Sequence, residues 1–274
     1  MDTWVWWPTV ILVGAAVGSF LNVVVYRIPQ GLSVWSPPSQ CPSCHTPLTA
    51  KDNIPVLGWW LLRGRCRYCQ APISWRYPLV ESLCLGLFAL CFWVVDWQPQ
   101  LAVAWLFVTW LLALALIDAD TGYLPEVLTR GGVVAGAIIR LVQPWWVGSG
   151  SLTASLSSLL MGIAAAVLGI WLLEGLRGLW LLVRHKEALG LGDGKLLAGI
   201  GMVLGWWPGV ILTVILASVS GLVVTVVRWL WQRATAKTWD QPLPFGPHLA
   251  VGGCLAFLFG EAWVEHYWQW LLGL

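Results

Sequence analysis

Long runs of apolar residues, separated by short polar stretches, dominate the chain. Because a helix that spans a membrane needs about 20 mostly apolar residues, these runs predict an all-α polytopic integral membrane protein with about eight transmembrane helices. The second, third and fourth runs are short, so about seven or nine spans would also fit the pattern. The runs cover residues 5–26, 79–95, 101–117, 132–147, 158–183, 190–207, 209–231 and 248–271.

The composition excludes most classes of soluble protein. Of the 274 residues, 58% are hydrophobic and only 10% are charged, whereas a soluble domain carries roughly 25% charged residues. We therefore expect neither a water-soluble globule nor a disordered chain nor a coiled coil. The 23 Trp residues fit a protein with two membrane–water interfaces, where indole rings settle. The first run follows Asp2 and no basic residue, so we expect a retained helix and not a cleaved signal peptide.

The basic residues predict the orientation of the spans. Fourteen of the fifteen Lys and Arg residues fall on one side of the membrane, and only Arg140 does not. The positive-inside rule makes this side cytoplasmic and places both termini outside. The net charge of +2 gives no argument for nucleic acid as a partner. The fourteen are Arg27, Lys51, Arg63, Arg65, Arg67, Arg76, Arg130, Arg177, Arg184, Lys186, Lys195, Arg228, Arg233 and Lys237.

The largest polar stretch, residues 28–77, holds four of the seven cysteines. Cys41-Pro-Ser-Cys44 and Cys66-Arg-Tyr-Cys69 form two C-x-x-C pairs separated by 21 residues. Two such pairs can supply the four sulfur ligands of a tetrahedral zinc site. Since four thiolates leave no open position for water, we interpret the predicted zinc as structural. The alternative is a set of redox-active or free thiols.

The other candidate ligands have simpler interpretations. His45 follows the first pair and could replace a cysteine, although four sulfurs suffice. Cys84, Cys91 and Cys254 lie in apolar runs and are expected to be small buried hydrophobic residues.

Two acidic residues stand at the predicted cytoplasmic rim of the membrane. Asp118 ends the third apolar run, and Asp193 lies in Gly190-Leu-Gly-Asp-Gly-Lys195 at the start of the sixth. Acids at such positions are costly and are candidates for function. Two carboxyl groups at one depth could share a proton, one activating water while the other polarises a carbonyl. The neighbouring glycines, Gly192 and Gly194, would let a substrate backbone approach closely.

A purely structural interpretation of both acids stays open. Asp193 could cap a helix N-terminus, and Asp118 could be an ordinary charge at the rim. Asp120 is the alternative to Asp118, but it points about 200° away on a helix, so only one of the two can face Asp193. Glu126 could assist the chemistry or be a solvated loop acid.

Several stretches together resemble the type 4 prepilin peptidase family. The order of the stretches along the chain matches the family from about residue 14 to residue 253. Two departures concern only the loop after Pro125, where Glu126 replaces the family's usual Asp and Arg130-Gly131-Gly132 stands where relatives often have Pro. The matching stretches are Gly18–Pro29, the paired C-x-x-C loop with Asn53-Ile54-Pro55, Arg76–Glu81, Asp118–Pro125, Gly190–Lys195 and Pro244–Pro247.

The resemblance implies a bifunctional membrane enzyme of the bacterial inner membrane. It would remove the short basic leader of type IV prepilins or type II secretion pseudopilins after a Gly at the cytoplasmic face. It would then N-methylate the new N-terminus with S-adenosylmethionine. Asp118 and Asp193 would be the catalytic pair, and the cysteine loop would serve methyl transfer. The implied domains are a first transmembrane helix (1–27), a cytoplasmic zinc-binding domain with four cysteine ligands (28–77) and a transmembrane aspartic peptidase bundle (78–274).

Acidic and glycine-flanked residues near the rim are the candidates for contacting a basic leader. Alternatives from other classes remain: a peptidase without methyl transfer, a transporter whose rim carboxylates bind ions, or a scaffold whose zinc loop docks a partner. A zinc protease would need an H-E-x-x-H motif, which the chain lacks. The oligomeric state is not predicted. The candidate substrate contacts are Glu81, Glu126, Gly192, Gly194, Lys195 and Asp52.

Overall fold

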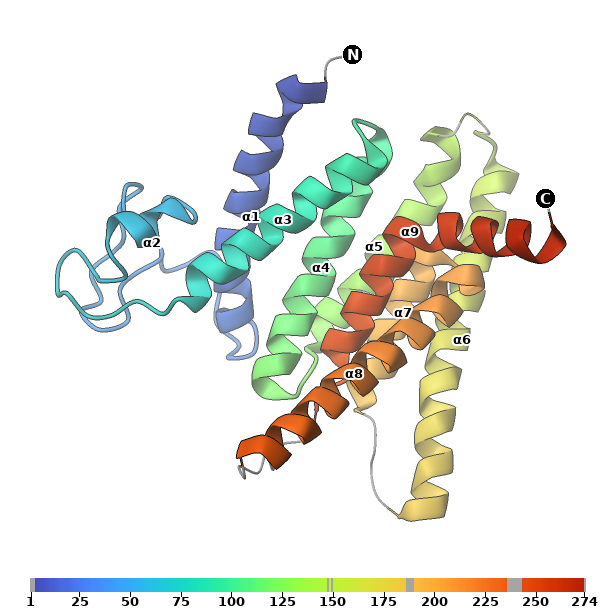
Figure 1. The fold of residues 1–274 in the computed structure, drawn as a ribbon. Helices are drawn as coiled ribbons and strands as arrows, with labels where there is room; N and C mark the ends of the chain where they lie inside the picture. The colour runs from blue at the N-terminus through green and yellow to red at the C-terminus, as the bar shows by residue number, and fades with distance from the viewer. Residues whose placement is uncertain (1–2, 147, 149, 186–189, 236–242, 274) are drawn as a thin grey trace. The chain divides into compact units, whose positions relative to one another are not determined.

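The computed structural model describes residues 3–146, 148, 150–185, 190–235 and 243–273. The described part is almost entirely helical, with helices joined by short turns and one longer loop (Figure 1). It divides into two compact units, Met1–Thr109 and Trp110–Leu274, with α4 (Pro99–Thr121) passing from the first into the second. The predicted domain boundaries after residues 27 and 77 stay a prediction. Lys186 and Lys237, predicted to be cytoplasmic, lie outside the described residues.

The first unit is built on two helices that pack closely together. A short 3₁₀ turn, Thr3–Trp6, leads into α1 (Trp7–Arg27), which packs on α3 (Arg76–Val95). Glycines allow the close contact, because a Cβ atom on Gly18 would lie only 2.7 Å from the Cα atom of Glu81. The start of α4 joins this pair through Trp105, whose ring stacks on Phe88 at a centroid distance of 4.9 Å. Small residues thus let the two helices approach closely.

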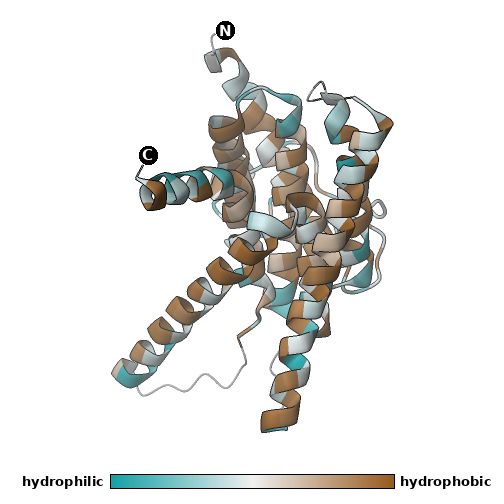
Figure 2. Cartoon of the chain, turned by 90° about the vertical axis from the view of Figure 1, so that its right-hand side faces the viewer, coloured by the Kyte–Doolittle hydropathy of each residue, from teal (hydrophilic) through white to brown (hydrophobic). Residues whose placement is uncertain are grey.

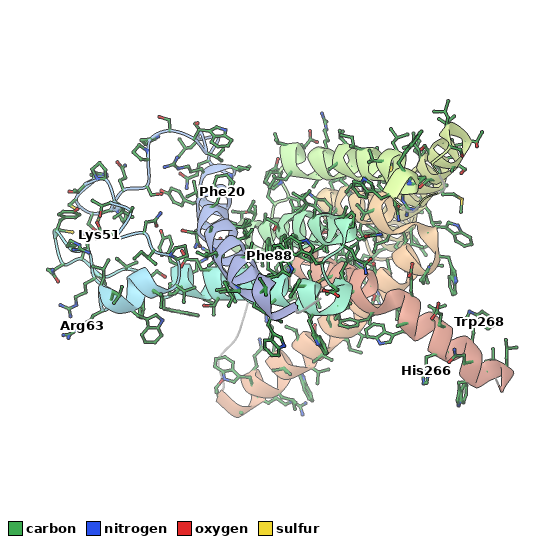
Figure 3. The ribbon with its side chains drawn as sticks, turned by 90° about the horizontal axis from the view of Figure 1, so that it is seen from above. Phe20, Lys51, Arg63, Phe88, His266 and Trp268 are labelled. Atoms are coloured by element: carbon green, nitrogen blue, oxygen red, sulfur yellow. The ribbon has the colours of Figure 1, made fainter. Side chains whose placement is uncertain are left out.

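A loop of irregular structure connects α1 to α3. It contains the short helix α2 (Leu57–Leu61) and two isolated β-bridges, Gln40 with Pro47 and Arg65 with Pro72. Figure 3 shows Lys51 and Arg63 on the outer part of this loop, away from the packed helices around Phe88. The apolar core of the first unit therefore lies between its helices, and the charged side chains gather on the loop.

The second unit surrounds one short helix with longer ones. Helix α7 (Leu191–Leu204) packs against α5 (Glu126–Trp146), α6 (Leu152–Arg184) and α9 (Gly246–Leu272). A π-helical turn, Trp206–Val210, leads from α7 into α8 (Ile211–Thr235), which packs along α9. Asp193, Gly194 and every residue from Leu196 to Met202 are buried, so α7 is enclosed on all sides. A helix that is apolar all round is one that other helices cover.

Six helical stretches are long and apolar enough to cross a membrane: Trp4–Arg27, Arg76–Val95, Pro99–Thr121, Leu152–Arg184, Trp206–Thr235 and Gly246–Leu272. They confirm the predicted all-α, multi-pass fold class. The predicted spans 132–147 and 190–207 are also helical, as α5 and α7, but neither is among these six. Helix α7 has 14 residues, or about 21 Å at 1.5 Å per residue, which is shorter than the roughly 30 Å of a bilayer core.

The outer helices of the second unit carry apolar side chains on exposed faces. Figure 2 shows hydrophobic residues along nearly the whole length of α6 and α8. On α8, Ile215, Val219, Leu222 and Val226 are exposed at the spacing of one helical face. In a membrane protein such a face is the surface that contacts lipid.

Candidate functional site

Asp118 lies in the last turn of α4 and Asp193 in the first turn of α7. Both are buried, each with 5% of its surface exposed. Asp120 is exposed, as the 200° separation on a helix requires when Asp118 faces inward. Of the two acids near the end of α4, only Asp118 thus lies inside the bundle.

The packing of α4 on α7 explains how the two acids come to the same level. Trp110 of α4 lies against Gly199 of α7, where a Cβ atom would be only 2.6 Å from the indole ring. A helix rises about 1.5 Å per residue. Asp118 therefore lies about 12 Å beyond Trp110 along the axis of α4, and Asp193 lies about 9 Å before Gly199 along the axis of α7. The two carboxyl groups lie near enough that the charge of Asp118 acts on Asp193.

Each carboxylate accepts a hydrogen bond from a backbone N–H group. The N–H of Gly246, the first residue of α9, donates to Oδ2 of Asp118 at 3.0 Å. The N–H of Gly190 donates to Oδ2 of Asp193 at 3.1 Å. Asp193 therefore does cap α7, as the structural interpretation expects, and it lies within electrostatic range of Asp118 as well. The two interpretations of Asp193 are compatible.

Gly246 is a contact of Asp118 that the sequence did not assign. A Cβ atom at this position would lie 2.5 Å from Oδ2 and 3.0 Å from Cγ of Asp118. Only glycine lets the backbone of α9 come this close to the carboxyl group. The signal was present in Pro244-Phe-Gly-Pro247, but nothing in the sequence linked that stretch to Asp118.

The two C-x-x-C pairs fold into turns of the same construction. In the first, the N–H of Cys41 donates to the Thr46 carbonyl at 3.0 Å and that of His45 to the Cys41 carbonyl at 2.9 Å. In the second, the N–H of Cys66 donates to the Ala71 carbonyl at 2.9 Å and that of Gln70 to the Cys66 carbonyl at 3.0 Å. His45 and Gln70 both have positive φ angles, of 55° and 58°. The repeated turn aims both pairs of thiols at one point.

The sulfur atoms fit a tetrahedral metal site. The Sγ atoms of Cys41, Cys44, Cys66 and Cys69 all lie within 4.8 Å of one another. Cys41 Sγ is 3.8 Å from Cys69 Sγ, and a tetrahedron of sulfurs about 2.3 Å from zinc has edges of about 3.8 Å. Hydrogen bonds with the side chain and backbone of Thr46 lower the pKa of Cys44 to about 6, which favours the thiolate that binds metal.

The remaining cysteines and His45 stand apart from this cluster. Among the described residues, the group that could hold a metal consists of the four loop cysteines alone. His45 is exposed. Cys84 and Cys91 are fully buried within α3, and Cys254 is partly buried in α9, as expected for small hydrophobic residues.

Comparison with known proteins identifies the family. Residues 12–95 match the model of the bacterial peptidase A24 N-terminal domain, and residues 105–226 match that of the type IV leader peptidase family. The chain belongs to the type IV leader peptidase family. This confirms the resemblance found in the motifs, and it favours a membrane peptidase over a transporter or a scaffold.

Curated relatives cover nearly the whole chain. A protein from Dickeya chrysanthemi is 38% identical over 93% of this chain and 93% of its own length, and one from Stutzerimonas stutzeri is 37% identical over 94% and 92%. A relative from Pectobacterium carotovorum subsp. carotovorum is 37% identical over 92% and 93%. All three are named prepilin leader peptidase/N-methyltransferase. No solved structure matches the chain.

In this leader peptidase family member, the two glycines beside Asp193 differ in how closely they are packed. A Cβ atom on Gly192 would lie 2.8 Å from Cβ of Leu124, in the turn between α4 and α5. Gly194 is buried, and a Cβ atom there would make ordinary contact with Glu174 at 3.6 Å. Gly192 therefore lets the end of α4 and the start of α7 approach. The predicted role of both glycines in binding substrate stays a prediction.

Glu126 and Lys195 form a cluster of charges at the starts of α5 and α7. The ammonium group of Lys195 contacts Oε1 of Glu126, and Arg130 contacts Oε2 at 2.7 Å. The hydrogen bond from Lys195, with the charge of Arg130, lowers the pKa of Glu126. Because two cations already compensate this carboxylate, its attraction for a basic leader is reduced. A substrate contact by either residue remains a prediction.

Glu81 connects the cysteine loop to the helices of the first unit. It is buried in α3, and its Oε2 accepts a hydrogen bond of 2.6 Å from the N–H of Val56, which precedes α2. The hydroxyl of Ser19 on α1 is a second hydrogen-bond partner. Glu81 thus joins α1, α3 and the loop at one point. Its predicted contact with substrate stays a prediction.

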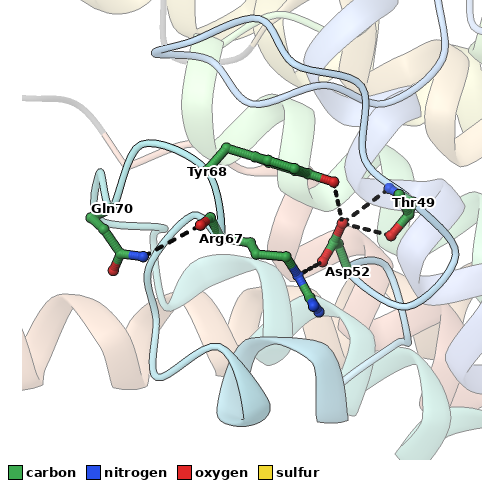
Figure 4. A network of polar contacts seen from close by, with 5 residues as sticks. All are labelled: Thr49, Asp52, Arg67, Tyr68 and Gln70. Carbon is green, nitrogen blue, oxygen red and sulfur yellow. Dashed lines mark hydrogen bonds and ion pairs between the residues drawn. The ribbon is translucent and has the colours of Figure 1, made fainter.

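Asp52 holds the second C-x-x-C turn in place (Figure 4). Its carboxylate is buried and accepts hydrogen bonds from Thr49 Oγ1 at 2.7 Å, Arg67 Nε at 2.5 Å and Tyr68 OH at 3.3 Å. Arg67 and Tyr68 are the two residues between Cys66 and Cys69. The Thr49 hydroxyl, with Arg67, lowers the pKa of Asp52. This stabilisation is therefore present above the unfolded pKa of about 3.9 and is lost as the pH falls through the lower folded value.

Replacing Asp52 with Asn is expected to loosen the metal site. Asn keeps the size of the side chain but loses the ion pair with Arg67, so a zinc ion supplied to the four cysteines should pass to a chromophoric chelator about 10-fold faster than from the wild type. The matched control is Gln70→Ala, which removes only the exposed 3.4 Å contact with the Arg67 carbonyl. Equal release rates for the Asp52→Asn variant and the wild type would show that the network does not support the cysteines.

Proposed function

We propose that the chain is an aspartic endopeptidase that removes the leader of prepilins or pseudopilins and then N-methylates the new N-terminus. Its catalytic pair would be Asp118 and Asp193. The observation that carries the proposal is the placement of both acids, buried and interacting, at the adjoining ends of α4 and α7. The family and the names of the relatives support the substrate class and the second activity.

The geometry suits peptide hydrolysis by water. Two carboxyl groups held close together in a medium of low dielectric constant favour a state in which they share one proton. The ionised group would accept a proton from the attacking water, while the protonated group would donate to the oxygen of the scissile carbonyl. The first group, which now holds the proton taken from water, would then protonate the leaving amine, while the second group takes a proton back from a hydroxyl of the tetrahedral intermediate as the C–N bond breaks. The N–H groups of Gly246 and Gly190 hold the two side chains during these steps.

The position of the pair matches a substrate that is itself a membrane helix with a basic leader. Asp118 and Asp193 lie at helix ends, where a flexible leader beside the membrane could reach them. We infer from the positive-inside rule that the basic loops lie on the cytoplasmic side. We infer that cleavage occurs after a Gly at the cytoplasmic face of the bacterial inner membrane, and that both termini of the enzyme are outside.

Zinc is the proposed metal of the cysteine loop. Cys41, Cys44, Cys66 and Cys69 would hold it, and the four sulfurs would leave no coordination position for a substrate. When bound, zinc would stabilise the folded loop. S-adenosylmethionine is the proposed methyl donor. Because Glu81 on α3 accepts a hydrogen bond from Val56 of the loop, a folded loop would also stabilise the packing of α1 on α3.

Mass spectrometry of a candidate prepilin incubated with the purified full chain and S-adenosylmethionine tests both activities. We expect loss of the leader and a gain of one methyl group on the mature product. Cys66→Ser should lose its zinc and reduce methylation by at least about 10-fold while cleavage continues. Cys84→Ser, in a buried position of α3, is the control for loss of a thiol. Full methylation by zinc-free protein would contradict the role of the loop, and an uncut prepilin would contradict the proposed function.

A further inference from the structure

A buried polar contact joins α8 to the first turn of α9. His248 has 8% of its surface exposed, and its Nδ1 lies 3.1 Å from Oγ of Ser220 on α8. A Cβ atom on the neighbouring Gly221 would lie 3.7 Å from Cδ2 of His248, so the ring rests against the α8 backbone. Buried polar groups without a partner are costly. The pairing of His248 with Ser220 therefore fixes one orientation of α9 on α8.

The hydrogen bonds around Ser220 define the direction of this contact. The hydroxyl of Ser220 donates to the carbonyl of Ala217 at 2.9 Å. A hydroxyl has one proton to donate and two lone pairs that accept. With its proton used on Ala217, Oγ accepts a hydrogen bond from Nδ1–H of His248. The side chain of His248 thus acts as a donor from α9 to α8.

The same turn of α9 supplies the backbone donor to Asp118. Gly246 precedes His248 by two residues, so the two residues point about 200° apart around the helix axis. Gly246 faces Asp118 on α4, and His248 faces Ser220 on α8. Pro247, which lies between them, has no N–H group to replace that of Gly246. A rotation of this turn would therefore break the hydrogen bond to Asp118, and the His248 contact opposes such a rotation.

We propose that His248 and Ser220 are positioning residues of the peptidase site. Their hydrogen bond holds the first turn of α9 so that the N–H of Gly246 meets the carboxylate of Asp118. This inference rests on the proposed role of Asp118. It assigns no chemical step to His248, because the imidazole acts through the backbone of α9.

Steady-state cleavage of a prepilin by variants of the full chain tests the proposal. His248→Leu and Ser220→Ala should each lower kcat by about 10-fold, because the reacting groups lose their alignment, while KM changes by less than about twofold. The double variant should be no slower than the slower single variant. His248→Asn should restore most of the rate, since its amide N–H can take the place of Nδ1–H. Ser218→Ala, which removes an exposed hydroxyl two residues away on α8, should match the wild type.

Several results would overturn the proposal. The first is a Ser220→Ala variant with the kcat of the wild type. The second is a double variant whose loss of kcat equals the combined losses of the two single variants. The third is a His248→Asn variant that unfolds at the normal temperature but does not regain the rate lost in His248→Leu. Asp118→Asn is assayed in parallel. An inactive Asp118→Asn with an unaffected Ser220→Ala refutes the positioning role alone, whereas an active Asp118→Asn refutes the catalytic pair itself.

Discussion

Asparagine at position 118 or 193 is expected to abolish leader cleavage, lowering kcat by at least about 10³-fold. Asn has the shape of Asp and can still accept the N–H of Gly246 or Gly190 through its carbonyl oxygen. It cannot take a proton from water or share one with its neighbour. The fold should persist, because both sites keep their backbone hydrogen bonds. The measurement is the rate of leader removal from a purified prepilin, followed by mass spectrometry.

Two comparisons make this experiment specific. Asp120→Asn changes an exposed acid two residues from Asp118 and should retain cleavage. Methylation of a pilin supplied without its leader should survive in both inactive variants, which would show that they are folded and inserted. If Asp118→Asn cleaves at a rate near that of the wild type, the pair is misassigned and Asp120 becomes the next candidate.

Gly246→Ala is expected to lower kcat by about 10² to 10³-fold. The new methyl group would lie 2.5 Å from Oδ2 of Asp118, and the neighbouring atoms Cγ and Cβ are at 3.0 and 3.2 Å. The carboxyl group must therefore move away, and it loses its hydrogen bond from α9. A displacement of about 1 Å at a catalytic group can cost about 10²-fold in rate. The assay is prepilin cleavage, with the midpoint of thermal unfolding measured on the same samples.

Other glycines in the second unit provide the control for this substitution. A Cβ atom on Gly131 of α5 or Gly175 of α6 would have no neighbour within 4 Å. Gly131→Ala and Gly175→Ala should leave cleavage unchanged and slightly favour their helices, since Ala has the higher helix propensity. Wild-type activity in Gly246→Ala would show that Asp118 works without the donor from α9.

The features that depend on local spacing could be predicted from the sequence. The four cysteines meet because each C-x-x-C pair closes its own turn and because only 21 residues separate the two pairs in the chain. Helical geometry alone predicted that only one of Asp118 and Asp120 can face Asp193.

Contacts between distant segments could not be predicted in the same way. The N–H of Gly246 donates to Asp118, which lies 128 positions earlier in the chain, and Ser220 on α8 contacts His248 on α9. Asp52 looked like an available acid, but its partners Arg67 and Tyr68 converge only when the loop is folded. The enclosure of α7 by α5, α6 and α9 could not be predicted either, because hydropathy does not distinguish burial in lipid from burial in protein.

The enclosure of α7 has a consequence for how the enzyme tolerates different membranes. Neighbouring protein, and not acyl chains, sets the height of this 14-residue helix and of Asp193 at its start. When the bilayer thins or thickens, helices with lipid-facing surfaces such as α8 adjust by tilting. The inner helix experiences that adjustment only through its contacts with α5, α6 and α9, so the height of Asp193 depends on the bilayer thickness only indirectly.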